Sequence, residues 1–212
     1  GEFTAGITEL DGAAKDAGLF ALSGASSTPA LSSSVVESLR GELAEIWVTE
    51  SAIMPGGKAP MGYSVMVSIL DQVGEKMPIW RGGCWRTATG WSRTRTIRAS
   101  RDMSRDASFI GAPELVLFPK FFGARSVLFR AGLELSVMNG SLRWLGVMRR
   151  LRLIPSLKTF LKPLRFLARQ LTHICRDSGA MVVEVTGPTV SDGEHVTHRW
   201  TLLADPGEGP FV

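Results

Sequence analysis

The stretch Ser23-Gly24-Ala25-Ser26-Ser27-Thr28-Pro29-Ala30-Leu31 is the most informative part of this 212-residue chain. The apolar run Leu19–Leu22 precedes it and is typical of a short strand buried on both faces in a parallel sheet. A helical pattern over 35–39 follows it, and Thr28 and Pro29 suit the N-cap and the first position of that helix. This arrangement predicts free backbone N–H groups at the carboxyl end of a strand, where open α/β sheets bind anions. A plain strand-to-helix connection with capping serines is the alternative.

The sequence on either side of this stretch predicts both helices and strands. Residues 3–17 have apolar side chains at helical spacing, and Gly18 predicts the end of that helix. Further along, Pro163 is expected to kink a helix, and Trp91–Arg105 has the polar, arginine-rich composition of an exposed edge or loop. The other expected elements are a strand over 46–51, a helix over 65–73, a hairpin over 78–86, a strand over 126–130, two helices between 141 and 176 separated at Pro155, and a hairpin over 181–204.

The composition favours an ordinary globular protein in a reducing compartment. Hydrophobic residues make up 44% of the chain and charged residues 21%. Cys84 and Cys175 lie far apart, so neither a disulfide framework nor a zinc site is indicated, and no metal site is expected. The first residues lack the basic start and apolar run of a signal peptide, and no segment is long enough to span a bilayer. We therefore expect a cytoplasmic protein.

Charge is distributed unevenly along the chain. Residues 81–176 hold 19 basic and 4 acidic side chains, whereas 1–80 hold 4 and 10, and 177–212 hold 1 and 6. A positive middle suits a phosphate-bearing cofactor, an anionic membrane surface, nucleic acid or an acidic partner, and a solvated basic face neutralised by the acidic flanks is the alternative. Four cations recur on one face of the helix after Pro155, namely Lys158, Lys162, Arg165 and Arg169. Binding to nucleic acid is supported by the arginines alone, and it ranks last among these partners.

The sequence lacks the common catalytic and nucleotide-binding motifs. It contains no G-x-G-x-x-G, no Walker-type loop and no G-x-S-x-G. The usual dinucleotide site is therefore not expected in this chain alone, hydrolase chemistry is unsupported, and no catalytic residue is identified.

Four stretches of the sequence carry a family resemblance, namely Phe3–Ile7 with Leu10–Ala14, Leu22–Ser33, Val127–Leu135, and Gly179–Val185 with Gly207–Val212. In these stretches, and across almost its whole length, the chain resembles the saccharopine dehydrogenase-like NAD(P)-binding oxidoreductases. The resemblance implies that residues 1–27 are the carboxyl-terminal remnant of a Rossmann α/β domain. It implies that residues 28–212 are a substrate and dimerisation domain of the α+β class, with a mixed, largely antiparallel sheet and helices packed on one face.

The resemblance also implies a function and a set of site residues. Gly24, Ala25, Ser26, Ser27, Thr28 and Pro29 would face NADP or NAD, which the full protein would hold and this chain alone would not bind strongly. Arg130 and Glu134 are substrate-binding candidates, because a charged pair beside a buried strand end needs a partner or a ligand, and a structural ion pair is their alternative. The expected partners are an amino-terminal nucleotide-binding domain and a second copy in a homodimer. A non-catalytic module that dimerises or binds anionic membranes through the basic helix is the alternative function.

Overall fold

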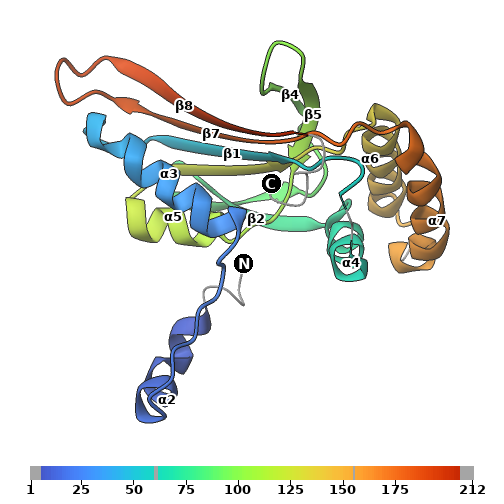
Figure 1. Ribbon diagram of the computed structural model, residues 1–212, viewed down its shortest axis with the longest axis horizontal. Coiled ribbons are helices and arrows are strands. Elements are labelled where there is room, and N and C mark those ends of the chain that lie inside the picture. Colours follow the sequence, from blue (N-terminus) through green and yellow to red (C-terminus); the bar gives the residue numbers. More distant parts are fainter. Residues whose placement is uncertain (1–5, 60–61, 155, 206–212) are drawn as a thin grey trace.

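Figure 1 shows a computed structural model of the chain, which describes residues 6–59, 62–154 and 156–205. Eight strands form one open sheet in the order β3-β2-β6-β1-β7-β8, with β5 paired to β6 and β4 paired to β5. Only the β1–β6 pair is parallel among these strands, so the predicted mixed, largely antiparallel sheet is confirmed. The strands are β1 (Val48–Met54), β2 (Lys76–Arg81), β3 (Cys84–Thr89), β4 (Arg95–Arg98), β5 (Ser104–Phe109), β6 (Ser126–Ala131), β7 (Gly179–Pro188) and β8 (His195–Ala204).

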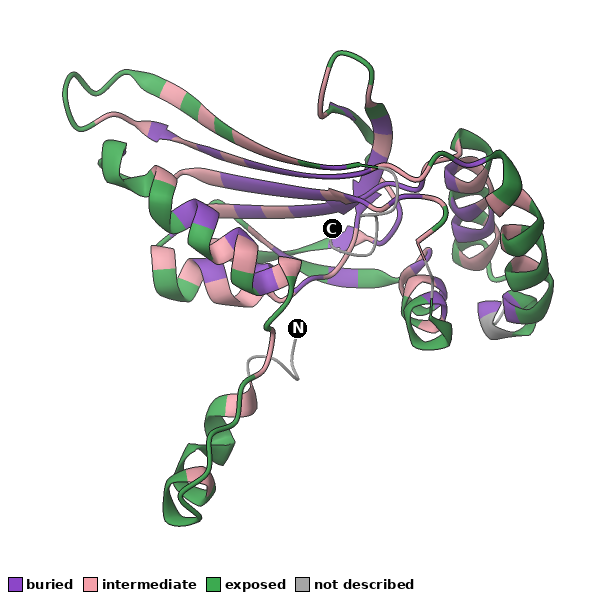
Figure 2. Cartoon of the chain, in the orientation of Figure 1, coloured by how far each residue is buried: buried purple, intermediate pink, exposed green. Residues whose placement is uncertain are grey.

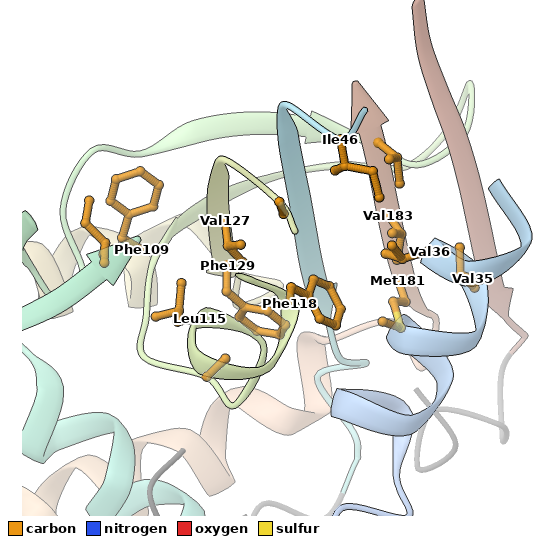
Figure 3. Close-up of a cluster of buried hydrophobic side chains, with 14 of the residues drawn as sticks. Val35, Val36, Ile46, Phe109, Leu115, Phe118, Val127, Phe129, Met181 and Val183 are labelled. Atoms are coloured by element: carbon orange, nitrogen blue, oxygen red, sulfur yellow. The ribbon is translucent and has the colours of Figure 1, made fainter. Parts of the chain in front are cut away.

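Two helices, α3 (Ser32–Leu39) and α5 (Glu114–Phe122), cover one face of this sheet (Figures 1 and 3). Alternate residues of a strand point to opposite faces, so Met181, Val183 and Val185 of β7 all face these helices. Figure 3 shows Met181 and Val183 beside Val36 of α3 and Phe118 of α5, and both helical residues are fully buried. The main hydrophobic core therefore lies between the sheet and this helical layer.

The opposite face of the sheet has a smaller apolar core and a group of charged side chains. Ala52, Met54 and Val182 pack there against Ile97 of β4 and Ala107 of β5. The β4–β5 hairpin therefore covers the part of this face near the carboxyl end of β1. Within the segment over 91–105, predicted as an exposed edge or loop, β4 is indeed an edge strand in which only Ile97 is buried, whereas β5, which begins at Ser104, reaches the core.

Three further helices gather beyond one end of the sheet, on the right in Figure 1. They are α4 (Tyr63–Gln72), α6 (Ser136–Arg150) and α7 (Leu161–Leu171). Met66, Leu142 and Leu161 are among the buried residues of the core that these helices share. Pro163 is the third residue of α7, where a backbone N–H has no intrahelical acceptor, so the helix continues past it to Leu171, and the segment before α7, Leu157–Phe160, is a 3-10 helix. Pro155 lies outside the described residues.

The amino-terminal arm, which we define as residues 6–22, projects away from the rest of the molecule (Figure 1). It contains a 3-10 turn (Ile7–Leu10) and the short helix α2 (Asp11–Asp16), which ends before Gly18 as predicted. Gly18 has a φ of 63°, a backbone conformation that glycine adopts at little cost. The predicted strand Leu19–Leu22 does not form here, because no strand of the described residues pairs with it, and it is exposed instead of buried.

No helix in the described part of the chain combines the length and the apolar character that a membrane crossing requires.

Candidate functional site

The bend that we define as Ser23–Pro29 joins the arm to the sheet domain and is largely open to solvent. Its serines are exposed or half-buried, and only Pro29 is buried. Gly24 has a φ of 79°, and its carbonyl accepts a hydrogen bond from the Ser26 N–H over 2.8 Å. The bend is therefore a preformed turn whose outer surface is accessible to another molecule.

The predicted start of the helix at Thr28 and Pro29 agrees with the backbone in part. Thr28 has the extended conformation of an N-cap residue (φ −127°, ψ 118°), and the residues after it are helical, but Ser27–Leu31 forms a wide turn and the regular helix α3 begins only at Ser32. No side chain caps this helix start through a hydrogen bond to its backbone N–H groups. The first turn of α3 is instead held by contacts to the neighbouring helix.

A buried polar contact ties the bend to the sheet domain. The Ser32 hydroxyl lies 3.0 Å from the Pro29 carbonyl oxygen and 2.7 Å from Oε1 of Glu114, in the first turn of α5. Ser32 and Glu114 are both fully buried, and Oε2 of Glu114 has no hydrogen-bond partner among the described residues. Burial raises the pKa of the Glu114 carboxyl, and the hydrogen bond from Ser32 opposes this effect only in part.

Three large apolar side chains lie in the arm just before the bend, and all are exposed. The exposed fractions are 71% for Leu19, 86% for Phe20 and 68% for Leu22. Figure 2 shows that exposure continues along most of the arm. Such a contiguous apolar stretch in a globular protein commonly marks a surface that another partner covers.

Arg130 and Glu134, the two predicted substrate-binding residues, do not pair with each other. Arg130 is buried on the charged face of the sheet, where it donates to Glu50 and to the Arg93 carbonyl and lies 4.1 Å from the centre of the Phe109 ring. The same face holds three more charged residues that join this network, Arg95, Glu184 and Arg199. Arg130 is thus held by a carboxylate and a backbone carbonyl of the protein itself.

Glu134 follows β6 and connects three segments that are distant in sequence. Its carboxylate accepts hydrogen bonds from the N–H of Gly57 (2.8 Å) and the N–H of Arg176 (2.5 Å). The Arg105 guanidinium is 3.6 Å away, and both side chains are nearly buried. Glu134 therefore holds the loop after β1 against the segment that leads into β7.

Arg105 is a structural residue that sequence reasoning missed. It donates to the carbonyls of Met54 (3.0 Å), Pro55 (2.7 Å) and Ser178 (2.7 Å) and is buried. The available signal was its spacing, because Arg105 shares one face of β5 with the buried Ala107. An arginine on the apolar face of a strand indicates a satisfied internal cation.

A cleft of about 610 Å³, which we call the helical cleft, opens beside Glu134, a volume within the range of small-molecule sites. The loop after β1 forms one wall, and residues of α4, α6 and α7 form the others. The residues in its wall that carry polar side chains are Lys58, Glu134, Arg165, Arg169, Thr172 and Cys175. The bend residues Gly24–Pro29 and Arg130 are not part of this wall.

Cys175 does not have the properties of an activated nucleophile. Burial raises the pKa of its thiol and the Glu134 carboxylate adds to this effect, while Arg105 and Lys58 oppose it. A raised pKa keeps the thiol protonated at neutral pH, whereas reactive cysteines need the thiolate. The helical cleft is therefore better suited to binding than to thiol chemistry.

The loop after β1 packs closely at Gly57, which allows a testable prediction. A Cβ on Gly57 would lie 2.5 Å from Sγ of Cys175 and 2.6 Å from Oε2 of Glu134, so Gly57→Ala should lower the free energy of unfolding by about 1–3 kcal/mol. Urea unfolding measures this loss. Thiol labelling in a Cys84→Ser background should show faster modification of Cys175 because its cover is displaced.

Gly140→Ala is the matched control for this variant. Gly140 lies inside α6, and nothing is within 4 Å of a Cβ built on it. This change should raise stability by roughly 0.5–1 kcal/mol because alanine favours helix more than glycine does. Equal stabilities for Gly57→Ala and the unmodified chain would show that the loop is not held as described.

Among the residues that the structure describes, no group of three or more His, Cys, Asp or Glu side chains could hold a metal ion. Comparisons with models of known protein families and with curated proteins found no match for this chain.

Proposed function

We propose that this chain is the substrate-side domain of a saccharopine dehydrogenase-like, NAD(P)-dependent oxidoreductase. In this proposal residues 1–27 end a nucleotide-binding domain of the Rossmann type, and residues 28–212 form the substrate and dimerisation domain. The observation that carries the proposal is the arm, where Leu19, Phe20 and Leu22 are exposed directly before the bend.

The chemistry of the arm explains why another domain would cover it. An apolar run without a polar face is typical of a strand in a parallel sheet that is buried on both sides. If Leu19–Leu22 joined such a sheet, its backbone groups would form hydrogen bonds with a neighbouring strand and its apolar side chains would be buried. The bend would then lie at the carboxyl end of that sheet, where open α/β folds bind dinucleotides.

The residues of the bend fit a position beside the cofactor. Gly24, Ala25 and Ser26 leave the backbone accessible, and Ser26, Ser27 and Thr28 add hydroxyl groups for an anionic or polar ligand. The glycine-rich turn that binds the pyrophosphate is absent from this sequence, so the partner domain would supply it. NAD(P) supplies the hydride chemistry, and the protein orients the reacting groups.

The coding sequence that precedes Gly1 tests this proposal. We expect it to encode a strand, a G-x-G-x-x-G turn and a helix, and the longer polypeptide to bind NADPH, measured by the fluorescence of the dihydronicotinamide. A preceding sequence without this motif, or a longer polypeptide that binds neither NADH nor NADPH, would overturn the proposal.

Variants in the arm make a second prediction. In the longer polypeptide, Phe20→Ser combined with Leu22→Ser should weaken NADPH binding at least tenfold, because two buried apolar contacts would be replaced by polar groups. Val190→Ser, in the turn between β7 and β8, is the control, since Val190 is 67% exposed and lies apart from the arm in sequence. Equal losses in both variants would contradict a specific role for the arm.

A second candidate function is binding to an anionic membrane surface, and one observation favours it. Only Leu161 of α7 is buried, whereas Phe166 is 67% exposed and Ile174, just after the helix, is 69% exposed. Lys162 and Arg165 of the same helix are also exposed. Salt-sensitive sedimentation of the chain with anionic but not neutral vesicles would support this function, and the absence of sedimentation would remove it.

A further inference from the structure

A smaller cavity of about 180 Å³ lies beside the helical cleft, between α4, α6 and α7. The two cavities share the side chains of Met66, Leu133, Met138 and Ala168 in their walls. The two cavities are therefore adjacent. We call the smaller cavity the narrow end of the site and the helical cleft its wide end, and the two differ sharply in chemistry.

The narrow end is apolar. Leu70 of α4, Leu142 of α6 and Leu164 of α7 are among the residues that enclose it, and Ser141 provides the one hydroxyl in its wall. Ser141 already donates to the Val137 carbonyl within its own helix over 2.8 Å. Because no free polar group faces this cavity from its wall, it suits a hydrocarbon chain.

The wide end is cationic. Lys58, Arg165 and Arg169 lie in its wall, and none of them forms an ion pair with an acidic side chain in the described ranges 6–59, 62–154 and 156–205. The one carboxylate in the wall, Glu134, is occupied by Arg105 and by two backbone N–H groups. A ligand at this end therefore meets a net positive surface.

We infer that the helical cleft binds an anionic amphiphile. Its hydrocarbon chain would occupy the narrow end, and its carboxylate or phosphate head would contact Lys58, Arg165 and Arg169. Guanidinium groups bind both kinds of head through paired hydrogen bonds. This inference concerns a cavity separate from the bend and does not rest on the proposed oxidoreductase function.

Calorimetric titration of the full chain with ligands below their critical micelle concentration tests the inference. Octanoate, decanoate and dodecanoate should bind with an affinity that rises about fourfold per added methylene until the narrow end is filled. Dodecanol should bind at least tenfold more weakly than dodecanoate, because it lacks the charge. Dodecyl phosphate compared with dodecanoate identifies the preferred head, and inorganic phosphate alone should show no measurable binding.

Variants of exposed residues on α7 locate the head group. Arg165→Ala combined with Arg169→Ala should weaken dodecanoate binding at least tenfold while dodecanol binding stays unchanged. Lys162→Ala is the matched control, since Lys162 is exposed on the same helix but lies outside the cleft wall, and it should stay within twofold. Ala168→Phe, at the junction of the two cavities, should abolish the dependence on chain length.

Several outcomes would overturn the inference. One is equal affinity for dodecanol and dodecanoate, and another is an unchanged affinity in the double arginine variant. An equal loss in Lys162→Ala would indicate a diffuse electrostatic surface. Sedimentation with anionic vesicles without binding of any monomeric ligand would favour the membrane function over a ligand cleft. Because no cofactor takes part, failure of NADPH binding in the longer polypeptide would leave these results unaffected.

Discussion

Replacing Arg105 with methionine should lower the free energy of unfolding by about 3–5 kcal/mol, the range found when one partner of a buried ion pair is removed. The change would leave the nearly buried Glu134 without its nearest cation, which lies 3.6 Å away. It would also remove the donor for three carbonyl oxygens, those of Met54, Pro55 and Ser178. Urea unfolding followed by tryptophan fluorescence measures this loss.

Two further variants separate charge from packing at Arg105. Arg101→Met removes an exposed arginine from the turn between β4 and β5, and its stability should stay within about 0.5 kcal/mol of the unmodified chain. Adding Glu134→Gln to Arg105→Met should recover part of the loss, because the unpaired carboxylate is then neutral. A stability of Arg105→Met within about 1 kcal/mol of the unmodified chain would show that these contacts contribute little.

Periodicity in the sequence predicted those elements whose own residues determine them. The β2–β3 hairpin forms around Gly82 and Gly83, with φ values of 63° and 75°, and it pairs Trp80 opposite Trp85 as expected for cross-strand aromatics. The strand β6, the helix α4 and the β7–β8 hairpin were predicted within a few residues for the same reason. In each case apolar residues recur at the period of the element, and a glycine or a turn bounds it.

Elements whose burial depends on distant partners were missed or misplaced. The β4–β5 hairpin is rich in arginine and reads as exposed, yet Arg105 is buried because carbonyls from β1 and from the start of β7 surround it. The helix α5 (Glu114–Phe122) was not predicted at all. The segment Leu19–Leu22 reads as a strand, but a strand needs a neighbour to complete its hydrogen bonds.

The two candidate sites also differ in how far the sequence alone predicts them. The bend Ser23–Pro29 is continuous in sequence, so its turn-forming residues could be recognised directly. The helical cleft combines Gly57, Glu134 and Cys175 with α7, and no local pattern predicts that these segments meet. Arg130 and Glu134 were expected to need a partner or a ligand; in the structure each has a different protein partner, because β6 ends between them.

Relative to the unmodified protein, Glu114→Gln should gain stability as the pH rises from about 4 to about 8, because glutamine, unlike the buried carboxyl, does not titrate. The Glu114 carboxyl is fully buried, its Oε2 has no hydrogen-bond partner among the described residues, and burial raises its pKa. Glutamine carries no charge at any pH. Its amide oxygen can accept the Ser32 hydrogen bond that Oε1 of Glu114 accepts now over 2.7 Å.

The pH dependence of this effect has a definite sign. A carboxyl whose pKa is raised in the folded state binds its proton more tightly there, so its stabilising contribution is complete below the ordinary glutamate pKa of about 4.3. That contribution is lost as the pH rises through the raised pKa of the folded protein. The two proteins should therefore differ little at about pH 4, and the advantage of Glu114→Gln should grow as the pH increases.

Thermal unfolding of both proteins at each pH provides the measurement. The difference between their free energies of unfolding removes the contribution of other titrating groups, which is the same in both proteins. Glu194→Gln, at an exposed position before β8, should show no such trend and stay within about 0.5 kcal/mol. A Glu114→Gln protein that is less stable at high pH, with a curve parallel to that of the unmodified chain, would mean that Glu114 is ionised and required as a charge. The Ser32 hydroxyl lies within hydrogen-bonding distance of both Glu114 and the Pro29 carbonyl. That result would therefore mean that an ionised Glu114 helps to hold Ser32, and through it the bend, in place.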